Sequence, residues 1–329
     1  GNISFVPSFS EKYPPLKNYI NGKPTAASSA KTLEVISPID GTLLSTVPMS
    51  TAKDLNDAVM VAQKAFVSWS RKPIKERVQV FFKFKTLLER DLNILAALVQ
   101  EENGKTLGEA VAEVEKCIEL TEFATSLPQL ISGEVLEVSK GVECRTEHVP
   151  LGIVASIVPF NFPAMVPNWT MPNAIALGNC MIMKPSEKVP MSCMKIAELL
   201  QEAGLPDGVF NIVNGDVEVV NAICDHPAIE AVSFVGSTKV AKIVYQRATH
   251  NYKRALALGG AKNHLMVLPD AKEDMTAANV VASMSGCAGQ RCMAASAMVG
   301  VGKIDHIIEK IVAEAKKVVP GQNLGAVIN

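Results

Sequence analysis

Short apolar runs alternate with helical patterns through the second half of the chain, and this alternation limits the possible folds more than any other feature. Strand–helix alternation requires crossover connections, and therefore a parallel sheet with helices on both faces. Such sheets bind ligands at the carboxyl ends of their strands. The sequence therefore predicts an α/β fold. We expect strands at 152–158, 180–183, 209–213, 231–235 and 265–268, and helices at 192–203, 217–224, 240–248 and 277–285.

The first half of the chain predicts short strands followed by long helices. Residues 1–50 predict an arm of short strands, with turns at Asn21-Gly22 and Asp40-Gly41. Apolar residues then recur at helical spacing from Leu55 to Trp69, after Thr51 as a plausible cap. Further helical patterns predict one long helix over 74–102, broken by Asn103-Gly104, and another over 107–127.

Composition excludes several classes of protein. The 329 residues are 48% hydrophobic and 20% charged, which suits a folded chain with a large core. The net charge of −1 offers no basic stripe for nucleic acid, and no apolar run approaches the roughly 18 residues that span a membrane. Seven cysteines, an odd number, favour a reducing compartment over a disulfide framework. The N-terminus lacks a signal-peptide core, but it begins with Gly, which leaves a removed presequence open.

Cys292 is the strongest candidate for chemistry. It follows a run of small residues at 285–289, where the backbone can approach a ligand closely. The adjacent Arg291 places positive charge near the sulfur and favours the thiolate, the species that attacks a carbonyl. The alternative is a buried structural cysteine. Cys287, five residues earlier, is interpreted as packing, because the pair lacks the spacing of a zinc site and no metal is expected.

Polar residues follow three of the predicted strands. Asn161 could donate to an oxyanion, although such an Asn also suits a simple turn. Lys184 and Glu187 could hold a ribose diol, or could equally be a solvated loop. Gly236-Ser237 opens a predicted helix, whose N-terminus could bind a pyrophosphate. The usual GxGxxG fingerprint of dinucleotide-binding proteins is missing from the sequence.

In their residues and in their order along the chain, these segments resemble the aldehyde dehydrogenase superfamily, and the resemblance covers essentially the whole chain. The nearest resemblance is to the methylmalonate-semialdehyde dehydrogenase branch, which oxidises malonate and methylmalonate semialdehydes with NAD and releases an acyl-CoA. The phrases that carry it are PFNFPAMVPNW (159–169), GNCMIMKPSEKVP (178–190), SFVGS (233–237), GGAKNH (259–264) and GQRCMA (289–294). The resemblance implies an N-terminal arm (1–50), a Rossmann-like NAD-binding domain (51–259) and the first part of a catalytic domain (260–329), whose remainder lies outside this chain.

The resemblance also assigns roles. Cys292 is the nucleophile, and Asn161 with the Cys292 backbone amide forms the oxyanion hole. Arg291 binds the carboxylate of the aldehyde substrate, and Lys116 stands where the branch usually has a second arginine. Lysine keeps the charge but loses the two-pronged geometry of arginine. The contacts to NAD are assigned to Val158, Phe160, Lys184, Glu187, Lys188, Ser237 and Gly259.

One departure from the superfamily bears on the reaction. General aldehyde dehydrogenases carry a water-activating glutamate where this chain has Ala257. Coenzyme A as co-substrate removes the need for that base, because a thiol ionises more readily than water. A hydrolytic enzyme that gives a free acid, and a non-catalytic dinucleotide-binding fragment, are the alternatives. The resemblance further implies a homo-oligomer, dimer or tetramer, in the cytoplasm of a bacterium or the mitochondrial matrix of a eukaryote.

Overall fold

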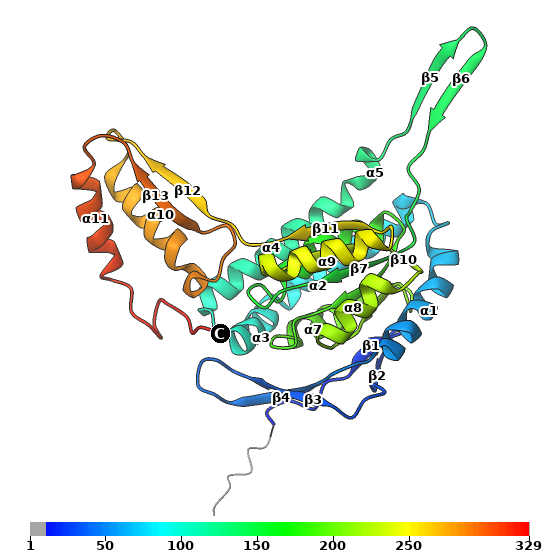
Figure 1. Ribbon diagram of the computed structural model, residues 1–329, viewed down its shortest axis with the longest axis horizontal. Coiled ribbons are helices and arrows are strands. Elements are labelled where there is room, and N and C mark those ends of the chain that lie inside the picture. Colours follow the sequence, from blue (N-terminus) through cyan, green and yellow to red (C-terminus); the bar gives the residue numbers. More distant parts are fainter. Residues whose placement is uncertain (1–10, 329) are drawn as a thin grey trace, which may run out of the picture.

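The computed structural model describes residues 11–328, and its centre is a seven-stranded sheet in the order β11-β10-β7-β8-β9-β1-β2 (Figure 1). The parallel strands are β7 (Ile153–Ile157), β8 (Cys180–Lys184), β9 (Phe210–Ile212), β10 (Ile229–Val235) and β11 (Arg254–Leu258). β1 (Asn18–Ile20) and β2 (Lys23–Thr25) add an antiparallel edge. The predicted α/β fold with a parallel sheet is confirmed.

The strand order places a topological switch point between β7 and β10. From β7 the chain steps outward to β8 and β9, then returns to lay β10 and β11 on the other side of β7. Right-handed crossovers put the helices of these two halves on opposite faces. One face carries α6 (Met165–Ala176) and α7 (Met191–Glu202), and the other carries α1 (Ala52–Trp69), α8 (Val217–Asp225) and α9 (Thr238–His250).

A second helical layer packs outside α6 and α7. It consists of α2 (Ile74–Arg90), α3 (Leu92–Asn103), α4 (Leu107–Thr125) and α5 (Leu127–Leu130). The prediction of one helix over 74–102 was wrong, because Asp91 (φ −99°, ψ 15°) separates α2 from α3. Its carboxylate forms ion pairs with Arg90 at 2.7 Å and with Lys195 of α7 at 3.6 Å, so a contact with another helix lies at the break. Gly104, at φ 89°, ends α3 at the predicted place.

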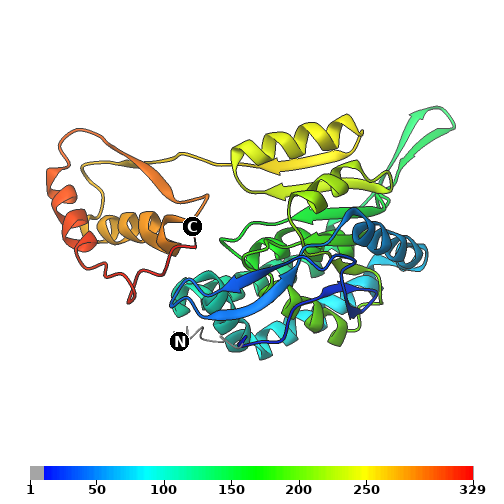
Figure 2. The ribbon, with the colours of Figure 1, turned by 60° about the horizontal axis from the view of Figure 1, so that its bottom comes forward.

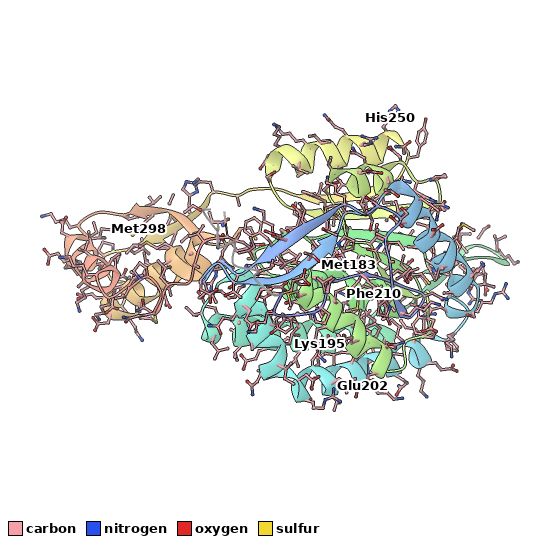
Figure 3. The ribbon with its side chains drawn as sticks, turned by 90° about the horizontal axis from the view of Figure 1, so that it is seen from below. Met183, Lys195, Glu202, Phe210, His250 and Met298 are labelled. Atoms are coloured by element: carbon pink, nitrogen blue, oxygen red, sulfur yellow. The ribbon has the colours of Figure 1, made fainter. Side chains whose placement is uncertain are left out.

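The last part of the chain lies apart from the sheet (Figure 2). It contains the parallel pair β12 (Asn263–Val267) and β13 (Ala295–Gly300), with α10 (Glu273–Ser285), the short helix η1 (Gly286–Gly289) and α11 (Asp305–Ala315). Figure 3 shows Met298 of β13 in this part, far from Met183 and Phe210 of the central sheet. The proposed domain boundary at about residue 260 stays a prediction.

Two hairpins flank the body. One pairs β3 (Thr32–Ile36) with β4 (Leu43–Pro48), and the other, formed by β5 (Glu134–Ser139) and β6 (Val142–Thr146), projects with every residue exposed (Figure 1). β1 and β2 lie within the predicted arm, yet they extend the sheet; residues 1–10 of the arm lie outside the described residues. Among the helices within residues 11–328, none is long and apolar enough to cross a membrane.

Candidate active site

A cavity of about 450 Å³ opens at the carboxyl ends of β7 and β10, where the strand order reverses. This is the place at which doubly wound sheets bind their ligands. Asp216, Val217 and Val220, which the sequence did not single out, also line it. Six of the seven residues expected to contact NAD line this cavity: Val158, Phe160, Lys184, Glu187, Lys188 and Ser237.

The polar lining of this cavity suits a dinucleotide. Lys184 is almost fully buried, and its Nζ donates to the carbonyl of Pro185 at 2.8 Å and lies 3.4 Å from Glu187 Oε2. Burial lowers the pKa of the Lys184 ammonium. Ser237 caps α9 by accepting the Val240 N–H at 3.4 Å, so the start of α9 lines the cavity. A lysine–glutamate pair suits a ribose diol, and a helix N-terminus suits a phosphate.

Gly259, the seventh residue of the expected set, lines a different cavity of about 540 Å³ beside α9. A Cβ at Gly259 would lie 3.0 Å from Thr238 Cα, so the glycine lets β11 approach the start of α9 closely. Ala257 lines the same cavity. The structure does not bring Gly259 together with the other six residues, and its contact with NAD stays a prediction.

Asn161 and the segment that carries Cys292 meet although they are far apart in sequence. The Nδ2 of Asn161, in the loop after β7, donates to the carbonyl of Gln290 at 2.8 Å, two residues before Cys292. The Oδ1 of Asn161 is buried and has no protein partner within the described residues. Cys292 is partly exposed, and its carbonyl accepts Asn263 Nδ2 at 2.9 Å. The expected nucleophile and oxyanion donor therefore lie in adjoining loops.

Cys287 differs from Cys292 in its surroundings. Its side chain is buried, with Sγ 3.6 Å from the carbonyl of Asn161 and 3.8 Å from Asn103 Oδ1. Burial raises the pKa of the Cys287 thiol. A thiol with a raised pKa forms little thiolate and is a poor nucleophile. These surroundings support the interpretation of Cys287 as a packing residue.

A buried ion pair that sequence reasoning missed holds the Asn161 loop. Lys105 Nζ lies 2.5 Å from Glu113 Oε2, and both side chains are fully buried. The same Nζ donates to the carbonyl of Asn161 at 2.9 Å and lies 4.1 Å from the centroid of the Phe162 ring. Glu113 Oε1 accepts the Ala164 N–H at 2.8 Å. The sequence feature that could have pointed to Glu113 is its spacing: Glu109 and Glu113 are four residues apart and therefore lie on one face of α4.

The first of those glutamates, Glu109, contacts the other loop. Its Oε1 accepts the Cys287 N–H at 2.7 Å and lies 3.4 Å from Arg291 Nη2. Lys116 lies seven residues further along α4, about two turns and roughly 10 Å along its axis. It is exposed and forms an ion pair with Glu119. The structure does not bring Lys116 into contact with Arg291, and its role toward the substrate stays a prediction.

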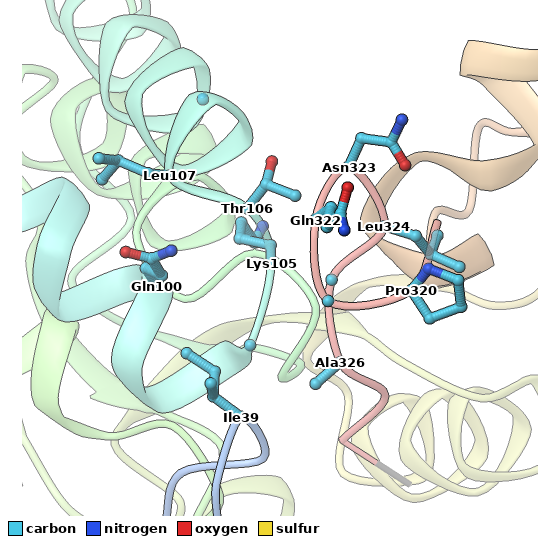
Figure 4. A pocket seen from close by; sticks show the side chains of 14 residues that line it. Ile39, Gln100, Lys105, Thr106, Leu107, Pro320, Gln322, Asn323, Leu324 and Ala326 are labelled. Atoms are coloured by element: carbon cyan, nitrogen blue, oxygen red, sulfur yellow. The ribbon is translucent and has the colours of Figure 1, made fainter. Parts of the chain in front are cut away.

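The start of α4 also receives the end of the described chain. A cavity of about 760 Å³ lies between residues 104–108 and 320–326 (Figure 4). The Ala326 N–H donates to the carbonyl of Gly104 at 2.8 Å, and the Ile328 N–H lies 3.3 Å from Gln290 Oε1. Three loops, those of Asn161, Cys292 and the chain end, therefore rest on the junction of α3 and α4.

Known proteins resemble this chain over most of its length. The model of the aldehyde dehydrogenase family matches residues 25–329. The chain is 46% identical over 311 residues to malonate-semialdehyde dehydrogenase 1 of Geobacillus thermodenitrificans and 47% identical over 311 residues to malonate-semialdehyde dehydrogenase of Lacticaseibacillus casei. These matches cover 94% of this chain but only 64% and 63% of the relatives, so the chain spans less than two thirds of their length.

Solved structures show the same likeness. A Sinorhizobium meliloti 1021 protein of the methylmalonate-semialdehyde dehydrogenase type, complexed with NAD, superposes with a TM-score of 0.94 at 40% identity, over 97% of this chain and 67% of that one. The methylmalonate-semialdehyde dehydrogenase of Oceanimonas doudoroffii gives a TM-score of 0.91 at 41% identity, over 94% and 64%. The chain therefore belongs to the aldehyde dehydrogenase family, as its motifs predicted.

Proposed function

We propose that the full-length protein oxidises malonate or methylmalonate semialdehyde with NAD and releases acetyl-CoA or propionyl-CoA with loss of CO₂. The observation that carries this proposal is the hydrogen bond from Asn161 to Gln290 in the Cys292 loop. Asn161 follows β7, and the residues just before it, Val158 and Phe160, line the dinucleotide cavity. The similarity to proteins named malonate- and methylmalonate-semialdehyde dehydrogenase supports the choice of substrate.

The side chains divide the chemistry between them. The Cys292 thiolate adds to the aldehyde carbon, and the Asn161 amide with the Cys292 N–H stabilises the resulting oxyanion. The six cavity residues would hold NAD, which would supply the hydride acceptor for oxidation of the adduct. The acyl group is left as a thioester on Cys292, and Arg291 holds the substrate's carboxylate. That carboxylate is β to the thioester carbonyl, so CO₂ can leave through a stabilised enolate before CoA takes the acyl group.

Ala257 favours CoA over water as the acyl acceptor. It stands where general aldehyde dehydrogenases carry the water-activating glutamate, and an alanine side chain cannot accept a proton. This favours the CoA-acylating reaction over the hydrolytic alternative.

The proposal is tested with the full-length protein, malonate semialdehyde, NAD and CoA, with identification of the product. Acetyl-CoA, CO₂ and NADH in equal amounts support it. Free malonate as the product would favour the hydrolytic reaction. No NADH with any aldehyde would favour a non-catalytic dinucleotide-binding protein.

Arg291→Leu should reduce kcat/KM for malonate semialdehyde far more than for propanal, which has no carboxylate. A lost charge-assisted hydrogen bond costs roughly 1.5–3 kcal/mol, or about tenfold to more than a hundredfold. Steady-state kinetics with both aldehydes measure this, and Arg291→Lys is the matched control that keeps the charge. Equal losses on both aldehydes would mean that Arg291 serves the thiolate or the fold instead.

NAD should be preferred over NADP. Glu187, partly exposed in the cavity, should accept from the ribose hydroxyls and repel a 2′-phosphate. The ratio of kcat/KM for the two cofactors measures the preference, and Glu187→Gln should reduce it because the amide keeps an acceptor without the charge. A wild-type protein that uses both cofactors equally well would contradict the role of Glu187.

We also propose that the full-length protein is a homo-oligomer in a reducing compartment. The β5–β6 hairpin exposes Val135, Leu136, Val138 and Val142, each more than half accessible, on a projecting ribbon. An exposed apolar hairpin with unpaired edges suits pairing with another copy of the chain. All seven cysteines are free in the structure. Light scattering of the full-length protein, compared with a variant that carries Leu136→Lys, measures the contribution of the hairpin.

A further inference from the structure

Glu109 uses both oxygens of its carboxylate to join α4 to the loop that carries the nucleophile. Its Oε2 accepts the Thr106 N–H at 3.0 Å and the Thr106 hydroxyl at 3.1 Å, which closes a capping box at the start of α4. Its Oε1 accepts the Cys287 N–H at 2.7 Å and lies 3.4 Å from Arg291 Nη2. One side chain therefore connects a helix of the main body to the Cys292 loop.

The loop that Glu109 contacts has an unfavourable backbone. Cys287 and Ala288 have φ values of 51° and 52°, in the left-handed region that residues with a side chain seldom adopt. Such conformations persist only where the surroundings hold them. Gln290 holds this one from within the loop, through its N–H and Nε2 to the carbonyl of Cys287, both at 3.0 Å. Glu109 holds it from outside, through the Cys287 N–H.

Glu109 also provides the counter-charge of Arg291. A Cβ at Gly286 would lie 2.4 Å from Arg291 Cζ, so the glycine makes room for the guanidinium beside the loop. The two charged side chains are 33% and 21% exposed, so a substrate's carboxylate could reach the guanidinium from solvent. Such a substrate would share Arg291 with Glu109 and would be repelled by the Glu109 carboxylate.

We propose that Glu109 is a positioning residue for Cys292 and, at the same time, limits the preference for aldehydes that carry a carboxylate. The first role follows from the Cys287 N–H contact and the strained loop. The second rests on the proposed function, in which Arg291 binds the substrate's carboxylate. Glutamine cannot replace Glu109 in both roles, because it has one acceptor oxygen where the carboxylate has two, and it has no charge.

The experiment compares Glu109→Gln with three other variants of the full-length protein, using propanal and malonate semialdehyde. Glu109→Gln should lower kcat/KM for propanal by about tenfold or more, the value of a hydrogen bond to a charged group. The loss for malonate semialdehyde should be smaller, because Arg291 is released from its counter-charge. The ratio of the two kcat/KM values should therefore rise roughly 1.5- to fivefold, the range of a partly exposed ion pair.

Three variants separate position, charge and stability. Thr106→Ala removes the threonine half of the capping box and should lower the melting temperature while leaving the kinetics near wild type. Glu109→Asp keeps the charge near Arg291 but shortens the reach to Cys287, so it should impair both aldehydes and raise the ratio less than Glu109→Gln does. Glu115→Gln, an exposed carboxylate on the same helix, should change neither. The affinity for NAD, measured by fluorescence titration, should be unchanged in all four and reports correct folding.

The positioning role of Glu109 and its limit on carboxylate preference can be contradicted separately. If Glu109→Gln and Glu109→Asp oxidise propanal as fast as Thr106→Ala, the positioning role is wrong. If Glu109→Gln lowers kcat/KM equally for both aldehydes, the limit on carboxylate preference is wrong. Failure of the proposed function is seen in the wild-type protein, as a lack of preference for malonate semialdehyde over propanal. In that case the proposed limit on carboxylate preference is also wrong. The kcat/KM values for propanal still test whether Glu109 positions the Cys292 loop.

Discussion

Cys292→Ala in the full-length protein should abolish aldehyde oxidation, with a loss of at least about 10⁴-fold in kcat, while NAD still binds. Removing a covalent nucleophile leaves only the residual stabilisation from the oxyanion donors and binding. NAD binding should persist because the six cavity residues lie at the end of β8 and in the loops that follow β7, β8 and β10. Steady-state NADH production and a fluorescence titration of NAD measure the two effects.

Cys287→Ala is the matched control for this prediction. Alanine keeps the backbone N–H that donates to Glu109, and the neighbouring Ala288 already adopts the same left-handed conformation. The variant loses one buried sulfur, so it should be somewhat less stable but retain most of its activity. An inactive Cys287 variant beside an active Cys292 variant would reverse the assignment of the nucleophile.

Without CoA, the full-length protein should give a burst of NADH followed by a slow steady state. The position of the water-activating base is occupied by Ala257, and general-base assistance contributes about 10²–10⁴-fold. The thioester on Cys292 should therefore be long-lived in water and should react quickly with the thiol of CoA. Stopped-flow measurement of NADH, with one equivalent formed per active site in the burst, tests this directly.

Addition of CoA after the burst should restore fast turnover and release an acyl-CoA. N-acetylcysteamine, a small thiol that carries the reactive end of CoA but lacks its nucleotide part, is the control for specific binding of CoA. If NADH forms at the full rate without CoA and free acid accumulates, another group activates water. The CoA-acylating assignment would then be wrong.

The sequence was sufficient to predict four strands of the sheet, β7 to β10, and most polar residues of the cavity at their carboxyl ends, whereas β11 was not predicted. Strands β7 to β10 are short apolar runs, and their periodicity is a local property that can be read without the fold. Residues that directly follow parallel strands meet at one edge of the sheet, so Val158, Lys184 and Ser237 could be expected to line one cavity. The helix α6 was missed because Pro167 and Pro172 lie inside it, and proline usually argues against a helix.

What holds the Asn161 loop and the Cys292 loop was visible only in the folded protein. Glu109 and Cys287 are 178 residues apart, and Glu113 and Ala164 are 51 apart, so no local pattern links them. Asp91, at the break between α2 and α3, likewise forms an ion pair with Lys195 of another helix. Charged residues on a helix read as a solvated face in the sequence, since burial is a property of packing. Local periodicity therefore predicted most helices and strands and the edge of the sheet that binds ligands. Long-range contacts of buried and partly buried charges position the Asn161 loop and the Cys292 loop beside each other.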